Sequence, residues 1–173
     1  MLKLFVMTFI TTVLCISTVS GQEAVKPRKS PLAIVTMKYE DSYVKVTYSQ
    51  PHKHGRNIFG EEVWRTGANE ATEITLTGDL IIVQDTLTAG TYSLFTIPNE
   101  KEWTIIFNKQ LGQWGAYNYH APSDALRITV PTETLKEVVY EPFTISFEQK
   151  NEIAKMWLMW DRTKVGVPIR FID

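Results

Sequence analysis

The stretch Val44-Lys45-Val46-Thr47-Tyr48 decides the fold, because apolar and polar residues alternate along it with a period of two. The same alternation returns at 73–77 and 91–97. Successive side chains of a β-strand point to opposite faces, so this pattern is typical of strands with one buried face. An amphipathic helix would repeat about every 3.6 residues instead. The alternation therefore predicts a β-rich domain.

Turn-forming residues divide the chain into segments of about 8–12 residues, the spacing expected of a sandwich or barrel. We predict an all-β fold, an antiparallel β-sandwich or flattened barrel of about 8–10 strands. Gly78 separates two of these strands, which favours a tight hairpin at 77–79. The stretch 132–141 fits either a helical turn or a strand. The predicted strands cover residues 32–39, 43–49, 71–77, 79–84, 91–97, 102–108, 124–130, 143–148, 153–160 and 165–171.

Two segments, 103–107 and 156–160, are apolar on both faces. Such a strand lies between two covered layers, or has one face against a loop or a partner. We interpret the Met and Trp residues of 156–160 as core, because these types are usually buried for packing. The alternative is an aromatic platform for a sugar or a lipid.

The composition is that of an ordinary globular domain. The 173 residues include 18 Lys and Arg against 19 Asp and Glu, and 44% are hydrophobic. These values exclude a collagen, a disordered acidic chain and a disulfide-dense miniprotein. Nucleic-acid-binding domains normally carry a basic excess, so a net charge of −1 argues against that partner.

Residues 1–21 have the form of a secretory signal peptide. Lys3 precedes an apolar run over 4–16, and small residues follow it. We predict cleavage after Gly21, or alternatively after Ser20, and export to the periplasm or the extracellular space. A spanning helix needs about 20 apolar residues, so we expect no transmembrane helix in the mature chain.

The domain boundaries follow from this signal. Cys15, the single cysteine, is discarded with it, or alternatively is lipidated. The polar segment 22–31 contains two prolines and is predicted to be a flexible leader. We expect residues 32–173 to form a single β-sandwich domain.

The densest polar segment is 50–71, and a loop this long in a compact β domain is often functional. Arg56 and Arg65 can hold a carboxylate or phosphate through paired hydrogen bonds. Alternatively, they form ion pairs within the loop, with Glu61, Glu62 or Glu70. Trp64 offers a flat face to a sugar or other polar ring, or it plugs the end of the sandwich with Arg65 stacked on it.

The turn after Trp64 carries further candidate residues. Gly67 permits a positive φ, and Thr66 and Asn69 can fix a turn by local hydrogen bonds. The predicted ligand-binding residues are Arg56, Trp64, Arg65, Asn69 and Glu70. Their predicted ligand is a small polar molecule or a component of the cell envelope.

His52 and His54 have the spacing that places two imidazoles on one face of a strand. A metal site would need a further ligand, from Glu61, Glu62, Glu70 or His120. Pro51 and Gly55 instead favour a loop, so no metal and no cofactor is predicted. The chain also lacks a Gly-x-Ser-x-Gly nucleophile motif, and we favour a protein that is not an enzyme.

Four segments together resemble the domain of unknown function 2911 family of exported proteins from Bacteroidetes and related bacteria. They are 55–60, 64–72 (Trp-Arg-Thr-Gly-Ala-Asn-Glu-Ala-Thr), 89–98, and 103–108 with 115–117 behind it. The resemblance covers nearly all of the chain beyond the leader and implies export but no particular activity. His52 and His54 are not positions that the resemblance explains.

Three functions remain open from the sequence. The first is a non-catalytic binding module of the envelope with a polar site in the 50–72 loop. The second is a structural or assembly protein of the envelope whose 64–72 motif locks the fold. The third is a metal-dependent hydrolase that uses His52 and His54.

Overall fold

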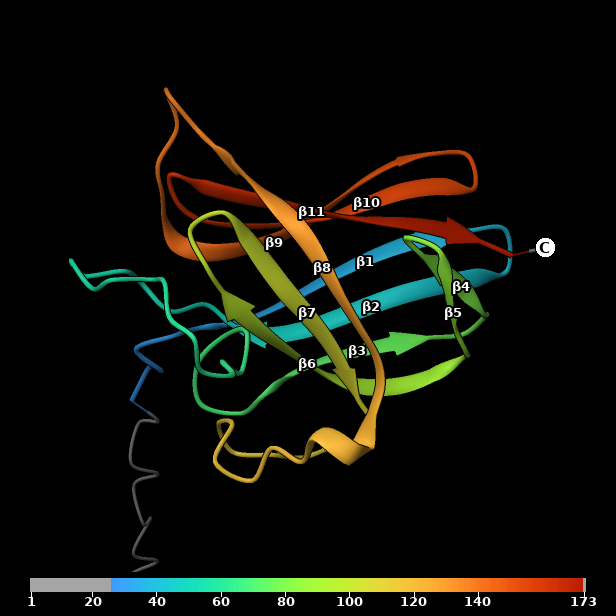
Figure 1. Ribbon diagram of the computed structural model, residues 1–173, viewed down its shortest axis with the longest axis horizontal. Helices are drawn as coiled ribbons and strands as arrows, with labels where there is room; N and C mark the ends of the chain where they lie inside the picture. Colours follow the sequence, from blue (N-terminus) through green and yellow to red (C-terminus); the bar gives the residue numbers. More distant parts are fainter. Residues whose placement is uncertain (1–25, 173) are drawn as a thin grey trace, which may run out of the picture.

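The structure is a computed structural model that describes residues 26–172, and these residues form the predicted all-β fold (Figure 1). The predicted signal peptide, Cys15 and the first residues of the predicted leader lie outside the described part. One short 3-10 helix, η1 (Ala121–Ser123), precedes β8. The strands are β1 (Leu32–Tyr39), β2 (Ser42–Ser49), β3 (Thr72–Leu76), β4 (Leu80–Ile82), β5 (Asp85–Leu87), β6 (Gly90–Pro98), β7 (Glu102–Asn108), β8 (Asp124–Thr134), β9 (Tyr140–Lys150), β10 (Ile153–Asp161) and β11 (Thr163–Phe171).

The strands form one antiparallel sheet that bends into a flattened, nearly closed barrel. The order around it is β1-β2-β3-β6-β7-β8-β11-β10-β9. One edge of β11 pairs with β10, and the other edge is shared by two strands. The first residues of β11 pair with β8 and its last residues pair with β4. The hairpin of β4 and β5 therefore covers the corner that β8 leaves open (Figure 1).

The predicted hairpin at 77–79 is wrong. β3 already has β2 on one edge and β6 on the other, so no edge is left for β4. The chain instead crosses at 77–79 to the opposite wall, and the hairpin forms one step later, at Val83-Gln84. The helical alternative for 132–141 is also wrong, since β8 and β9 extend into that stretch and a loop joins them.

The barrel is closed between β9 and the beginning of the 50–71 loop. The Phe143 backbone N–H donates to the Pro51 carbonyl at 2.9 Å, and the Lys53 N–H donates to the Glu141 carbonyl at 3.0 Å. Further along the seam, the Gln149 side-chain amide of β9 donates to the Lys38 carbonyl of β1 at 3.0 Å. The backbone bonds fix the start of the loop at this end of the barrel.

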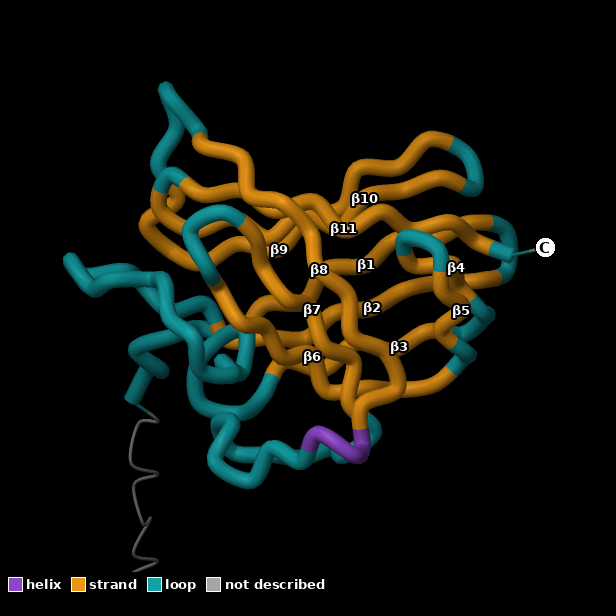
Figure 2. Tube along the Cα trace, in the orientation of Figure 1, coloured by secondary structure: helices purple, strands orange, loops and turns teal. Residues whose placement is uncertain are grey.

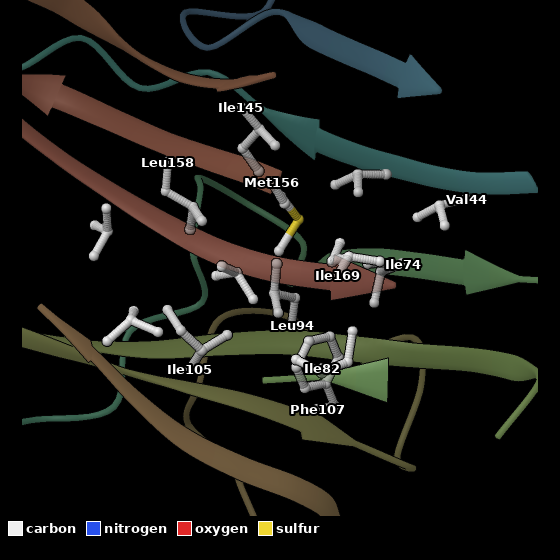
Figure 3. Close-up of a cluster of buried hydrophobic side chains, with 14 of the residues drawn as sticks. Val44, Ile74, Ile82, Leu94, Ile105, Phe107, Ile145, Met156, Leu158 and Ile169 are labelled. Carbon is white, nitrogen blue, oxygen red and sulfur yellow. The ribbon is translucent and has the colours of Figure 1, made fainter. Parts of the chain in front are cut away.

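The core lies between the two walls of the barrel and is built from the inward residues of the alternating strands. Figure 3 shows side chains from both walls meeting there. The fully or nearly fully buried members include Val44, Ile74, Ile82, Leu94, Ile105, Phe107, Ile145, Met156, Leu158 and Ile169.

The prediction of doubly buried strands at 103–107 and 156–160 is confirmed, but β6, whose alternation predicted one buried face, is buried on both faces as well. On the outer side of β6 and β7, Phe95 and Ile106 are fully buried beneath loop residues, Ala71 among them. On β10, residues 156–160 are all buried. The Trp157 side chain is only 8% exposed, and the ammonium groups of Lys155 and Lys164 lie 4.7 and 3.4 Å from its ring centroid, so the ring offers little free surface to a ligand.

Candidate functional site

Trp64 occupies the end of the barrel next to β6. Its backbone pairs with Thr96, by bonds of 2.7 and 2.9 Å, at a point where β3 has not yet begun. The indole stacks on Trp160 with 5.0 Å between ring centroids and meets Phe143 edge-on at 4.9 Å. It also meets Trp103 edge-on at 6.3 Å. Trp64 thus joins both walls and plugs the barrel end, one of the two arrangements predicted for it.

The turn after Trp64 is held from inside. Thr66 is fully buried, has a φ of 53°, and shares a hydroxyl–hydroxyl bond of 3.2 Å with Thr96. The Thr72 hydroxyl donates to the Thr66 carbonyl at 2.7 Å. The expected positive φ at Gly67 is wrong, because Thr66 and Asn69 adopt it instead. Gly67 is needed for a close approach, since a Cβ there would lie 3.0 Å from the carbonyl oxygen of Ser49.

The two arginines of the loop bond to carbonyl oxygens rather than to carboxylates. Arg56 donates to the carbonyls of His52 at 2.6 Å and Lys53 at 3.1 Å. Arg65 donates to the Asn69 carbonyl at 2.8 Å. Within residues 26–172 neither guanidinium has an ion-pair partner, so the predicted pairing with the loop glutamates is wrong.

The stacking predicted for Arg65 on Trp64 is also wrong. The Arg65 guanidinium lies 5.7 Å from the ring centroid of Tyr117, on the neighbouring loop. Arg56 instead lies 5.7 Å from the centroid of the Trp160 ring. The turns of the 50–71 loop bring its own backbone carbonyls to the two guanidinium groups. Because this arrangement depends on backbone conformation, the residue types alone did not predict it.

A cleft of about 330 Å³ lies above the barrel plug, and we name it the central cleft. Four of the five predicted binding residues line it, namely Arg56, Trp64, Arg65 and Asn69. Trp160 lines it as well. Trp160 is not among the residues predicted for the site, although it belongs to the apolar segment 156–160 that stands out in the sequence.

Glu70 faces a different cleft, of about 350 Å³, together with Arg28 and Trp114. The Glu70 carboxylate forms an ion pair with the Arg28 guanidinium at 3.1 Å. A hydrogen bond from its own backbone N–H, with a smaller effect of Arg28, lowers the pKa of the Glu70 carboxyl. The structure therefore brings four of the predicted residues together in the central cleft and places the fifth, Glu70, in the neighbouring cleft. Arg28 also shows that the predicted leader is in contact with the domain at this point.

A second loop, 109–123, packs against the candidate site from outside, a role that was not predicted from the sequence (Figure 2). The Gly115 N–H donates to the Asn69 carbonyl at 3.0 Å, and the Ala71 N–H donates to the Gln113 carbonyl at 2.8 Å. The end of this loop is fixed by Tyr119, whose hydroxyl donates to the Asp124 carboxylate at 2.6 Å. Burial, followed by this bond and the charge of Asp124, raises the pKa of Tyr119.

The histidines do not assemble a metal centre with their predicted partners. The rings of His52 and His54 stack with centroids 5.5 Å apart. Among residues 26–172 no group of three or more His, Cys, Asp or Glu side chains could hold a metal ion. His120 lies in the 109–123 loop, where its ring contacts the Ser123 hydroxyl at 3.1 Å.

These features define an all-β barrel protein whose end is closed by an aromatic plug beneath a polar cleft. The family described as Protein of unknown function (DUF2911) matches residues 30–169, so the chain belongs to that family. The family resemblance stated from the sequence is thereby confirmed. Comparison with curated proteins and with solved structures found no significant match. Over the described residues, no helix has the length and apolar character needed to cross a membrane.

Proposed function

We propose that this protein is an exported, non-catalytic binding module of the periplasm or the extracellular space. Its central cleft binds a small polar molecule that carries an anionic group. One observation supports this most strongly. The guanidinium groups of Arg56 and Arg65 both line the cleft, and among residues 26–172 no carboxylate side chain lines it with them.

The hydrogen-bonding capacity of the two arginines supports an anionic ligand. A guanidinium has five N–H donors in a fixed planar fork. Arg56 uses two donors on carbonyl oxygens and Arg65 uses one. The remaining donors can bind a carboxylate or phosphate, and the bonds already made hold each fork in place. Trp64, which is partly exposed, lines the same cleft beside the two arginines.

Export is supported by the signal-like composition of residues 1–21. Expression in a Gram-negative host followed by osmotic shock tests it. We expect the protein in the periplasmic fraction with Gln22 as its first residue. An intact N-terminus in the cytoplasmic fraction would contradict export.

Binding is tested by titrating D-galacturonate and inorganic phosphate into isotope-labelled protein, with D-galactose as the uncharged control sugar. We expect galacturonate to shift the side-chain signals of Arg56 and Arg65, with galactose shifting them far less. Arg56→Ala should weaken binding about tenfold or more. Arg170→Ala, which removes an exposed arginine on β11, should leave binding unchanged. If neither anion shifts the arginine signals, the proposed site is wrong.

A second function, a structural or assembly role in which 64–72 locks the fold, is favoured by a separate observation. The Trp64 ring contacts aromatic residues of both walls, and Thr66 is buried and hydrogen-bonded beneath it. This role depends on the inward side chains of the motif, whereas binding depends on the outward ones. Stability and binding measurements on the two sets therefore separate the functions.

A further inference from the structure

We propose that the central cleft is one subsite of a continuous groove that binds a linear acidic oligosaccharide, with Trp114 as a stacking platform beyond the cleft. The inference rests on the proposed function, because it names the class of ligand for the same site. It adds a binding surface on the 109–123 loop, which that function does not require.

Neighbouring clefts share lining residues, and we define the groove as the series of clefts linked in this way. A cleft of about 370 Å³ beside residues 57–63 shares Arg56, Trp64 and Trp160 with the central cleft. The central cleft in turn shares Ser30 and Asn69 with the cleft that contains Trp114.

The groove continues beyond Trp114. The Trp114 cleft shares Arg28 and Glu70 with a further cleft of about 300 Å³, which reaches Leu32 on β1 and Gly112 on the second loop. Four adjoining clefts thus follow one another around the end of the barrel. A single small molecule would occupy one of them, whereas a chain of several sugar units would use the whole groove.

Two aromatic residues of the 109–123 loop, Trp114 and Tyr117, are largely exposed. Trp114 is 59% exposed and Tyr117 is 79% exposed. The loop is nevertheless held in place, since Trp114 pairs with Glu70 through the backbone and the Gly115 N–H donates to the Asn69 carbonyl. A fixed loop that presents an open indole offers a stacking surface at little conformational cost.

The charge along the middle of the groove favours an acidic ligand. Arg56 and Arg65 line the central cleft, and Arg28 and Lys29 line the next one. Glu70 is the carboxylate residue lining these two clefts, and it is already paired with Arg28. The two end clefts are lined by Glu61 and Glu62 and by Glu73. The acidic units of the ligand therefore bind in the two middle clefts, where Arg56, Arg65 and Lys29 have no ion-pair partner among the described residues.

The backbone around the groove favours a glycan over an acidic peptide. Extended peptides are commonly bound by adding a strand to an unpaired sheet edge. Here the backbone N–H groups of Trp64, Ala71 and Thr72 already donate to carbonyls of Thr96, Gln113 and Arg65. The groove therefore offers aromatic faces and guanidinium groups, which suit sugar rings and their carboxylates.

The test is calorimetric titration of the domain with oligogalacturonates from the monosaccharide to the hexamer. We expect affinity to rise at least about tenfold between the monosaccharide and the tetramer. Trp114→Ala should lower the affinity for the tetramer about tenfold and leave that for the monosaccharide unchanged. Leu111→Ala is the matched control, because Leu111 is 48% exposed on the same loop but lines none of the four clefts.

The outcomes separate the two proposals. If Arg56→Ala does not weaken binding of any length, the proposed function fails. If the monosaccharide binds through Arg56 but affinity does not increase with length, or Trp114→Ala has no effect on the tetramer, the groove is refuted and the small-molecule site stands. Tighter binding of an oligoglutamate of equal charge than of the oligogalacturonate would overturn the assignment to a glycan.

Discussion

Replacing Trp64 by Ala should lower the free energy of unfolding by about 3 kcal/mol. The indole makes ring contacts with Trp160, Phe143 and Trp103, and aromatic pairs contribute about 0.5–1.5 kcal/mol each beyond the area they bury. Large core aromatics cost about 3–5 kcal/mol when truncated to Ala. Because Trp64 is partly exposed, we expect the low end of that range. For a domain of this size, the melting temperature should fall by about 6–12 °C.

Urea unfolding followed by far-UV circular dichroism measures this loss without depending on the fluorescence of the deleted indole. Tyr117→Ala is the control, because its ring is 79% exposed and its loss should change stability by less than about 0.5 kcal/mol. A loss below about 1 kcal/mol for Trp64→Ala would show that the ring does not plug the barrel. The hypothesis that the 64–72 motif locks the fold would then be refuted.

Three further predictions follow from the same end of the barrel. Gly67→Ala should cost about 1–3 kcal/mol by urea unfolding, because the new methyl group would crowd the Ser49 carbonyl; an unchanged midpoint would contradict the close approach. Tyr119→Phe should cost about 1–2 kcal/mol, since it removes the hydrogen bond from the Tyr119 hydroxyl to the Asp124 carboxylate. Because the folded-state pKa of Tyr119 is raised, its contribution is complete below about pH 10 and is lost as pH rises through that higher pKa, so the Phe variant should show a flatter alkaline stability profile. Glu70→Gln should change stability by less than about 0.5 kcal/mol in thermal melts, as its ion pair is exposed; a larger loss would show that the pair is structural.

The sequence predicted the strands well because their signal is local. The alternation at 44–48 and 91–97 marks which side chains face inward, and the structure places those residues in the core as expected. Pairing is not local, however. The prediction of a hairpin at 77–79 was wrong because β2 and β6 occupy both edges of β3. The residues of β3 and β4 do not indicate which strands lie beside them.

The candidate site was predictable as a segment but not as a set of contacts. Arginines in a loop rich in Glu suggest ion pairs, yet Arg56 and Arg65 bond to carbonyls that the folded loop presents. Trp160 and Trp114 lie far from the loop in sequence, so only the barrel closure and the second loop bring them to the groove. Residue types could indicate that a site exists here, while its walls depend on topology.

The two roles proposed for the 64–72 motif, locking the fold and binding a ligand, fall on opposite sides of the chain because the motif continues the alternation that decides the fold. Trp64 pairs with Thr96 as a strand residue would, so its ring points into the barrel and Arg65 faces the outer loop. Thr66 then adopts a positive φ, a conformation that costs a β-branched residue about 1–3 kcal/mol. Its bonds to Thr96 and Thr72 offset that cost. Substitutions of the inward residues should therefore change stability and those of the outward residues should change binding, so a variant such as Arg65→Ala that altered only stability would remove the case for a ligand.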